Sequence, residues 1–250
     1  METRLLENKV CIVTGASKGI GKSIATLFAK HGGIVYANAR KKNSLNEWAT
    51  EMSDTYQTRV IPVYFDVTDY DTVKKTILDI KSAEGKIDVL VNNAGMVTYE
   101  MIPMINRNLF KEMWEINVTA VLFLTQLVSR IMTRQKNGSI INISSMVGEK
   151  GASGQTAYAT TKGAVIALTK SAAKELAPQG IRVNAVAPGM VATERFVGEM
   201  ESRFKGKTDA IGMGRLAEPS EIAQLCVFLA SDTSSYITGQ IIGIDGSIVI

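Results

Sequence analysis

Short apolar runs alternate with longer amphipathic stretches along most of the chain. Apolar runs closed by glycine or polar residues are typical of buried strands, and apolar residues three and four positions apart predict helices. The predicted strands span residues 9–14, 34–39, 60–65, 87–91, 138–144, 181–187 and 241–244, and the predicted helices span residues 20–30, 69–83, 107–133, 157–176 and 218–230. This alternation indicates a parallel sheet in one α/β domain covering residues 1–250.

One long segment, residues 190–215, gives no firm strand signal. It follows the sixth predicted strand and is rich in glycine, methionine and charged residues. Because loops that follow strand ends commonly cover binding sites, we expect a mobile lid over a substrate here, with a short helix inside it.

A glycine-rich turn, TGASKGIG, joins the first predicted strand to the first predicted helix. Gly15, Gly19 and Gly21 let the backbone turn tightly and approach a pyrophosphate at the helix N-terminus. A P-loop would need glycine at position 16, where the chain has Ala16. The turn therefore predicts a dinucleotide site, and a helix-entry turn without a ligand is the alternative.

The end of the second predicted strand carries basic residues instead of the acidic residue that binds the ribose of NAD. No carboxylate appears before Glu47, whereas Arg40 is followed by Lys41 and Lys42. With Lys18 from the glycine turn, Arg40 suits a ribose 2′-phosphate, because a guanidinium binds two phosphate oxygens at once. The pattern favours NADP over NAD, and a solvated basic turn is the alternative.

A hydroxyl, a phenol and an ammonium lie close together in the sequence around residues 145–162. Tyr158 and Lys162 are four residues apart and share one face of the predicted helix. A cation beside a phenol favours the phenolate form, so Tyr158 is a candidate proton donor to a carbonyl oxygen that Ser145 also contacts. The spacing alone is weak evidence, since Tyr70 and Lys74 repeat it at an ordinary helix start.

Asn117 lies in the middle of the predicted helix 107–133, where asparagine is unfavourable because its amide competes for backbone hydrogen bonds. A functional kink and a surface asparagine are both compatible with the pattern.

Composition narrows the class of protein. The 250 residues are 46% hydrophobic and 21% charged, which fits one sizeable globular core. The net charge of +4 comes from scattered basic residues, so a nucleic-acid partner is not expected. Cys11 and Cys226 lie in apolar runs and predict buried free thiols in a reducing compartment. Since no apolar run approaches about 20 residues, we expect a cytoplasmic protein without a membrane partner.

Seven motifs occur in one order along nearly the whole chain: TGASKGIG, Asp66-Val67, NNAG, Asn117, Ser145, YATTK and Pro188-Gly189. In this order and at these intervals the chain resembles the classical short-chain dehydrogenase/reductases. The resemblance implies a doubly wound, Rossmann-like sheet of seven parallel strands with helices on both faces. It also implies carbonyl reduction or alcohol oxidation with a nicotinamide cofactor and without a metal.

The resemblance further implies a role for each motif residue. Ser145 orients the substrate oxygen, Tyr158 is the general acid or base, and Lys162 supports Tyr158 and holds the nicotinamide ribose. Asn117 retains a water that links Lys162 to solvent. The residues implied to bind the cofactor, NADP(H), are Gly15, Ser17, Lys18, Gly19, Ile20, Gly21, Arg40, Asp66, Val67, Asn93, Ala94, Gly95, Tyr158, Lys162, Pro188, Gly189, Val191 and Thr193.

Within the family, TGASKGIG, SSMVG and the tail from Glu221 to Gly246 resemble bacterial 3-oxoacyl-acyl-carrier-protein reductases of fatty acid synthesis. Two positions depart from that pattern. Gln179 replaces a commonly basic residue, although Lys136 keeps a positive charge before the fifth strand, and Ser247 stands where a double glycine is common. Reduction or oxidation of a sugar, steroid or small ketone is the first alternative, and cofactor binding without turnover is the second.

Family members are usually homotetramers. The resemblance therefore implies that helices 107–133 and 157–176 and the C-terminal strand pack against other copies of the chain. The apolar C-terminus, SIVI, is compatible with this packing.

Overall fold

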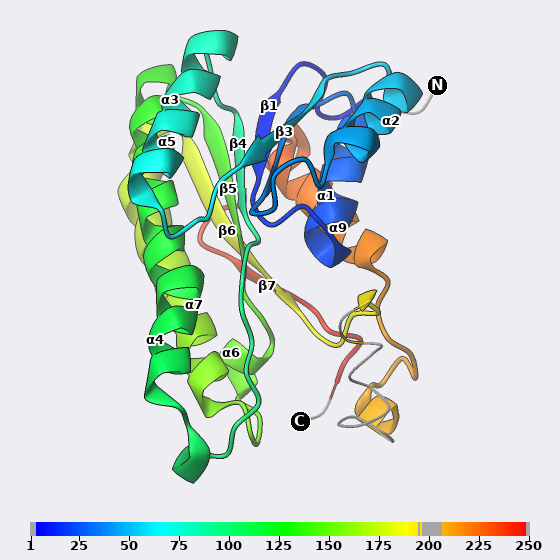
Figure 1. The fold of residues 1–250 in the computed structure, drawn as a ribbon, viewed down its shortest axis with the longest axis vertical. Helices are drawn as coiled ribbons and strands as arrows, with labels where there is room; N and C mark the ends of the chain where they lie inside the picture. Colours follow the sequence, from blue (N-terminus) through cyan, green and yellow to red (C-terminus); the bar gives the residue numbers. More distant parts are fainter. Residues whose placement is uncertain (1–3, 195, 197–206, 249–250) are drawn as a thin grey trace.

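The computed structural model describes residues 4–194, 196 and 207–248. They form one Rossmann-like domain around a sheet of seven parallel strands, as predicted (Figure 1). The strands are β1 (Val10–Val13), β2 (Ile34–Ala39), β3 (Val60–Tyr64), β4 (Val89–Asn92), β5 (Gly138–Ile143), β6 (Ile181–Pro188) and β7 (Ile241–Ile244). Their order across the sheet is β3-β2-β1-β4-β5-β6-β7.

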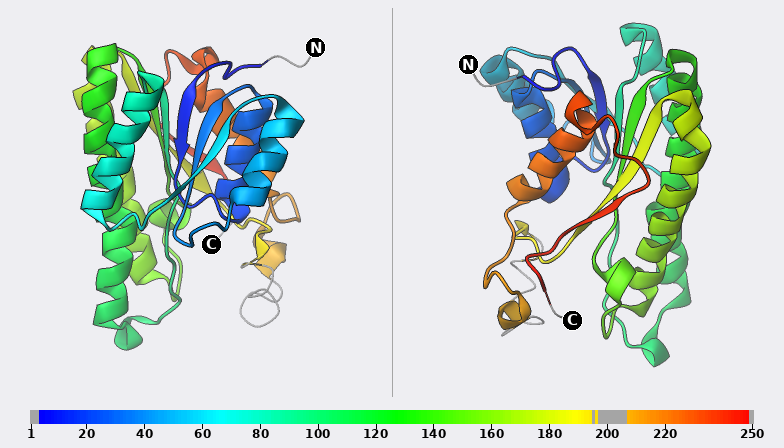
Figure 2. Two further views of the ribbon diagram at one scale, coloured as in Figure 1. Left: turned by 45° about the horizontal axis from the view of Figure 1, so that its top comes forward. Right: turned by 180° about the vertical axis from the view of Figure 1, so that it is seen from behind.

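Helices cover both faces of this sheet. The described helices are α1 (Gly19–Lys30), α2 (Asn46–Tyr56), α3 (Tyr70–Glu84), α4 (Arg107–Trp114), α5 (Ala120–Gln135), α6 (Val147–Lys150), α7 (Thr156–Leu176) and α9 (Pro219–Ala230). One buried apolar cluster joins the sheet to α1 and α9, and a second joins it to α3, α5 and α7. Figures 1 and 2 show these two helical layers on opposite sides of the sheet.

The order of the strands creates a switch point in the middle of the sheet. β1 pairs with β2 on one side and with β4 on the other, so successive strands are added in opposite directions from β1. In such sheets a crevice opens outside the carboxyl ends of the strands at the switch point. Gly15 follows β1 closely and Asn93 follows β4 directly, so both predicted binding segments lie at that crevice.

Strand positions were predicted well because the strands are nearly continuous apolar runs. Pro62 lies in β3, an edge strand, where a residue without a backbone N–H is tolerated. Two helices were missed. α2 fully buries only Ala49, and its apolar stripe of Trp48, Met52 and Tyr56 is narrow and partly buried, whereas α6 has only one turn.

The predicted helix 107–133 is a continuous helical segment from Arg107 to Gln135 that contains a π-helical turn at Glu115–Thr119. By length and composition it is long and apolar enough to cross a membrane, and half of its most apolar window is buried inside the fold. Its α5 part packs on β4, β5 and α3. The packing accounts for its apolar character.

Cys11 and Cys226 are both buried and free, as the sequence predicted. Burial in apolar surroundings raises the pKa of both thiols, so they remain protonated and unreactive near neutral pH.

The segment expected to be a lid, residues 190–215, is described only in part, since residues 195 and 197–206 lie outside the described residues. At its start Val191 pairs with Ala217, and near its end a short 3₁₀ turn spans Lys207–Ala210. Whether this segment is a lid stays a prediction.

Candidate active site

The glycine-rich turn leads directly into the N-terminus of α1. Gly15 and Gly19 have φ angles of 65° and 56°, in the left-handed region that favours glycine. Lys18 precedes the helix with extended backbone, and no side chain caps the first turn. The turn therefore leaves free N–H groups at the positive end of a helix dipole, which suits a phosphate group.

Side chains from neighbouring strands hold this turn in place. The Gly15 N–H donates to Asn38 Oδ1 at 3.2 Å, and Asn93 Nδ2 donates to the carbonyls of Thr14 and Gly15 at 2.9 and 3.1 Å. Thr14 Oγ1 in turn accepts hydrogen bonds from the N–H groups of Asn93 and Ala94. Asn38 and Thr14 were not predicted as functional residues, although their positions at the ends of β2 and β1 offered a signal.

An open cavity of about 420 Å³ lies over the turn and along the ends of β1, β2 and β4. It is lined by most of the residues predicted to bind the cofactor: Gly15, Ser17, Lys18, Gly19, Ile20, Gly21, Arg40, Asp66, Val67, Asn93, Ala94, Gly95 and Thr193. The residues that sequence reasoning missed in this lining are Asn38, Ala39, Met96, Glu112, Ile116 and Glu194.

Arg40 is a strongly exposed charge of this outer cavity. Its side chain is 74% exposed, and its guanidinium lies 3.8 Å from Asp66 Oδ2. An ion pair this exposed contributes little to stability, so Arg40 is available to a phosphate at the mouth of the cavity.

A second cavity of about 250 Å³ continues from the first, because both are lined by Ile20, Asn93, Gly95, Met96 and Thr193. The predicted residues Ser145, Tyr158, Lys162, Pro188, Gly189 and Val191 all line this inner cavity. The other residues that line this inner cavity but not the outer one are Val97, Tyr99, Ile143, Ser144, Met146, Val147, Gln155, Met190 and Phe196. Of residues 96–104, which follow the NNAG motif, Met101, Ile102 and Met104 are exposed and do not line it.

Lys162 lies deep in the inner cavity. Its side chain is buried, and Nζ donates to the Ile143 carbonyl at 2.7 Å and lies 5.7 Å from the centre of the Tyr158 ring. Burial lowers the pKa of Lys162 from 10.5 to about 8. Because this pKa is still above neutral pH, Lys162 remains mostly an ammonium there. It lies beside the Tyr158 phenol, which the sequence predicts on the same helix face.

Ser145 approaches the same cavity from the end of β5. Its hydroxyl oxygen accepts a hydrogen bond from the Val147 N–H at 3.2 Å, at the start of α6. The neighbouring Met146 N–H donates to the Pro188 carbonyl at 3.0 Å. The loop that carries Ser145 is therefore held against the loop that follows β6.

Asn117 is buried in the π-helical turn, so the surface alternative for this residue is wrong. Its amide accepts from the Met96 N–H and donates to the Met96 carbonyl, both at 2.8 Å, and it donates to Thr161 Oγ1 at 3.0 Å. A Cβ added to Gly95 would lie 3.4 Å from Asn117 Oδ1 and 3.7 Å from Lys162 Nζ. Asn117 thus joins the segment after β4 to the helix that carries Lys162. Turns of this kind are frequent at functional sites.

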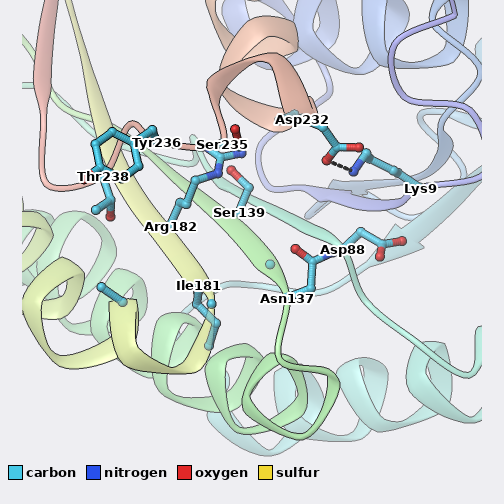
Figure 3. A pocket seen from close by; sticks show the side chains of 14 residues that line it. Lys9, Asp88, Asn137, Ser139, Ile181, Arg182, Asp232, Ser235, Tyr236 and Thr238 are labelled. Carbon is cyan, nitrogen blue, oxygen red and sulfur yellow. Dashed lines mark hydrogen bonds and ion pairs between the residues drawn. The ribbon is translucent and has the colours of Figure 1, made fainter.

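A separate cavity of about 430 Å³ lies at the opposite edge of the sheet, near the amino ends of β5 and β6 (Figure 3). Its charged groups are engaged within the protein: Lys9 pairs with Asp232 at 2.7 Å, and Arg182 donates to the carbonyls of Leu229 and Ser231. None of the predicted site residues lines this cavity.

The arrangement matches a known family of proteins. A family model described as enoyl-(acyl carrier protein) reductase matches residues 15–247. The chain is a short-chain dehydrogenase/reductase. The 3-oxoacyl-(acyl-carrier-protein) reductase FabG of Thermotoga maritima is 43% identical over 98% of this chain and 99% of its own length. This short-chain dehydrogenase/reductase is also 36% identical to the 3alpha-hydroxysteroid dehydrogenase of Mediterraneibacter gnavus, over 97% of this chain and 98% of that protein.

A solved structure gives the same result for the fold. A short-chain type dehydrogenase/reductase from Mycobacterium marinum superposes with a TM-score of 0.92 at 35% identity and covers 98% of this chain and 97% of its own. As a member of this family the chain is an oxidoreductase that uses a nicotinamide cofactor.

The outer cavity fits a dinucleotide on grounds of its own. An added Cβ at Gly21 would overlap Asn93 Nδ2 and the Gly15 carbonyl oxygen, and one at Gly15 would lie 2.9 Å from Ala94 Cα. The turn is therefore packed to the limit on its protein side, and the N–H groups at the start of α1, which no side chain caps, remain for a ligand. With glycine at these positions, a pyrophosphate can come close to the backbone of the turn, as dinucleotide binding in this fold requires.

Proposed function

We propose that this enzyme reduces the 3-oxo group of acyl thioesters carried on an acyl carrier protein, with NADPH as cofactor. The observation that carries the proposal is the convergence of Ser145, Tyr158 and Lys162 on one cavity that continues into the dinucleotide cleft. The names of relatives such as the Thermotoga maritima enzyme support the substrate class.

In this mechanism the bound nicotinamide supplies a hydride to the carbonyl carbon. Tyr158 donates its phenolic proton to the carbonyl oxygen as negative charge develops there, and Ser145 donates a hydrogen bond to the same oxygen. The Lys162 ammonium stabilises the phenolate that remains, because it lies 5.7 Å from the ring centre in a buried site. Asn117 Oδ1 accepts one hydrogen bond from Met96 and keeps a second lone pair for a water that resupplies the proton.

The preference for NADPH rests on charge at the end of β2. Asn38 is buried and already binds backbone groups. No acidic side chain follows β2 before Glu47, so none is placed there to receive the ribose hydroxyl groups. Arg40 and Lys18 both line the outer cavity and suit a 2′-phosphate. The remaining predicted cofactor contacts, from Gly15 to Thr193, belong to the same proposal.

The lining of the inner cavity favours an extended apolar substrate. Met96, Val97, Val147, Met190 and Phe196 surround the reacting groups, and methionine side chains adapt to chains of different shape. An acyl chain fits this lining. A steroid ketone is the second candidate, because the Mediterraneibacter gnavus relative is named as a steroid dehydrogenase at 36% identity.

Lys136 does not lie beside the reacting groups. It ends α5 just before β5 begins, and the length of β5 separates it from Ser145. An acyl carrier that reaches this inner cavity would therefore contact residues near the cavity mouth instead of Lys136.

A homotetramer and a lid over residues 190–215 complete the proposal. Apolar side chains on α4 and α5 remain exposed in the single chain, with Leu109, Leu122 and Phe123 between 38% and 50% exposed. Exposed apolar side chains of this kind are compatible with a surface for association.

The experiment that tests the proposal measures NADPH oxidation with a 3-oxoacyl thioester, beside a steroid ketone and a sugar, each repeated with NADH. Preference for the thioester with NADPH is the expected result. If the thioester is inert and the steroid ketone is reduced, the proposed substrate is wrong and the proposed reaction still holds. If no carbonyl is reduced, the chain is a cofactor-binding protein without turnover.

Tyr158→Phe tests the chemistry itself. The variant lacks the proton donor, so turnover should fall by about 10²–10⁴-fold while NADPH affinity changes little. Tyr70→Phe is a matched control, because Tyr70 has the same spacing to Lys74 and begins α3 away from the inner cavity. Equal turnover in the Tyr158→Phe variant and the parent enzyme would defeat the mechanism.

A further inference from the structure

The one-turn helix α6 ties the Ser145 loop to the end of the chain. Lys150, its last residue, places Nζ 2.7 Å from Asp245 Oδ2 and donates to the Ile248 carbonyl at 3.2 Å. Asp245 directly follows β7, and its other oxygen accepts from the Ser247 N–H at 3.1 Å. One ammonium therefore joins two segments that are far apart in sequence but adjacent beside the inner cavity.

This ion pair is better protected from solvent than an ordinary surface pair. The Asp245 side chain is 20% exposed and that of Lys150 is 41% exposed. The Lys150 ammonium holds the pKa of Asp245 below its usual range, so the carboxylate is charged at neutral pH. A carboxylate that is partly buried and doubly hydrogen-bonded fixes its partner more firmly than an exposed one.

The helix α6 depends on such contacts because a single turn is not stable by itself. Its start is held by the hydrogen bond from Met146 to Pro188, and its end is held by Lys150. Between them Gly148 packs on α7, where an added Cβ would lie 2.8 Å from the carbonyl carbon of Lys162. A shift of α6 would therefore reach both Ser145 and Lys162.

The Asp245 side of the pair supports the segment around Gly189, which also lines the inner cavity. The Gly189 N–H donates to the Ile244 carbonyl at 3.0 Å, and an added Cβ at Gly189 would lie 2.7 Å from Asp245 Cα. Ile248 is buried in one apolar cluster with Met146 and Val147. The last described residues of the chain thus contact both loops that line the cavity.

We propose that Lys150 and Asp245 are positioning residues for carbonyl reduction, and this inference rests on the proposed function. Their ion pair fixes α6 against the C-terminal segment and so holds Ser145 and Gly189 in place at the inner cavity. Neither side chain lines the inner cavity, so neither contacts the reacting atoms. A displacement of about 1 Å at a reacting group costs on the order of 10²-fold in rate.

The test compares this ion pair with a second one of equal length. Lys150→Met and Asp245→Asn should each lower kcat by about tenfold or more. Lys150→Arg keeps the charge and should restore most of kcat. The control is the pair Lys9–Asp232, also 2.7 Å long, which lies at the cavity on the other edge of the sheet (Figure 3). Lys9→Met should leave kcat unchanged.

The double variant tests the coupling. Because both single changes remove the same interaction, Lys150→Met with Asp245→Asn should have a kcat within about twofold of either single variant. Multiplied losses, an unchanged kcat in the single variants, or an equal loss in Lys9→Met would each overturn the proposal.

Amide hydrogen exchange decides the proposal independently of turnover. Exchange at residues 146–150 and at Gly189 should become faster in Lys150→Met and in Asp245→Asn but not in Lys9→Met. Unchanged exchange in these segments overturns the positioning role. A parent enzyme that reduces no carbonyl would refute the proposed function, and the exchange result would still show whether the pair holds the two loops.

Discussion

The buried ammonium of Lys162 makes the fold less stable than it would otherwise be. Burial lowers the pKa of Lys162 from 10.5 to about 8 in the folded chain. A difference of this size corresponds to about 3 kcal/mol of folding free energy near neutral pH, where the lysine is charged in both states. The folded state releases its proton first as pH rises. The free energy of unfolding should therefore increase between about pH 8 and about pH 10.5 through this group alone.

Lys162→Met removes the charge and keeps the length of the side chain. The variant also loses the hydrogen bond to the Ile143 carbonyl, 2.7 Å long, which offsets about 1.5–3 kcal/mol of the gain. We therefore expect the variant to be about as stable as the parent, or slightly more stable, at neutral pH. The decisive quantity is the pH dependence: between about pH 7 and about pH 9.5 the parent should gain about 2 kcal/mol relative to the variant.

Urea unfolding without cofactor, followed by circular dichroism at both pH values, measures this quantity. Lys170→Met is the matched control, because Lys170 is exposed on the same helix, and its difference from the parent should not change with pH. Turnover should be lost in Lys162→Met and kept in Lys170→Met. A difference between the Lys162→Met variant and the parent that is the same at both pH values would refute the argument that burial lowers this pKa.

Two further predictions concern the outer cavity. Arg40→Ala should weaken NADPH binding by about 10–100-fold and NADH binding by much less, because it removes a charge-assisted contact to the 2′-phosphate. Fluorescence titration measures both affinities, and equal losses for the two cofactors would contradict the assignment of NADP. Gly21→Ala should abolish binding of either cofactor, because the added Cβ would overlap Asn93 Nδ2 and the Gly15 carbonyl oxygen. Calorimetric titration measures this binding, and an affinity within about twofold of the parent would contradict the close packing of the turn.

The sequence predicted the sheet well because its strands are buried on both faces and read as apolar runs. It predicted α2 and α6 poorly for different reasons. The apolar stripe of α2 is narrow, whereas α6 is a single turn held by Lys150 and Gly148. Of the predicted catalytic residues, Ser145, Tyr158 and Lys162 line one cavity, whereas Asn117 does not line it. Ser145 lies there because it follows the carboxyl end of β5, and Tyr158 and Lys162 lie there because they are in the first turns of α7.

Residues that act through the backbone of distant segments were harder to predict. Asn38 binds Gly15, and Thr14 binds Asn93, but neither contact has a local pattern in the sequence. Each pairing depends on which strands become neighbours, and that order is set by the whole sheet. The pair Lys150–Asp245 is hidden for the same reason, since its partners come from α6 and from the end of β7.

These contacts share a physical purpose in the dinucleotide cleft. The glycines of the turn have no side chains with which to fix the backbone, and glycine loses more conformational entropy on ordering than any other residue. Asn38, Thr14 and Asn93 supply the missing constraints from three different strand ends. Because the turn is ordered before a ligand arrives, binding does not have to provide the free energy of ordering it. Lys162 is ordered in the same way, since its ammonium donates to the Ile143 carbonyl. Burying this ammonium beside Tyr158 lowers the free energy of unfolding, and the fold gives up that stability to keep the charge at the site.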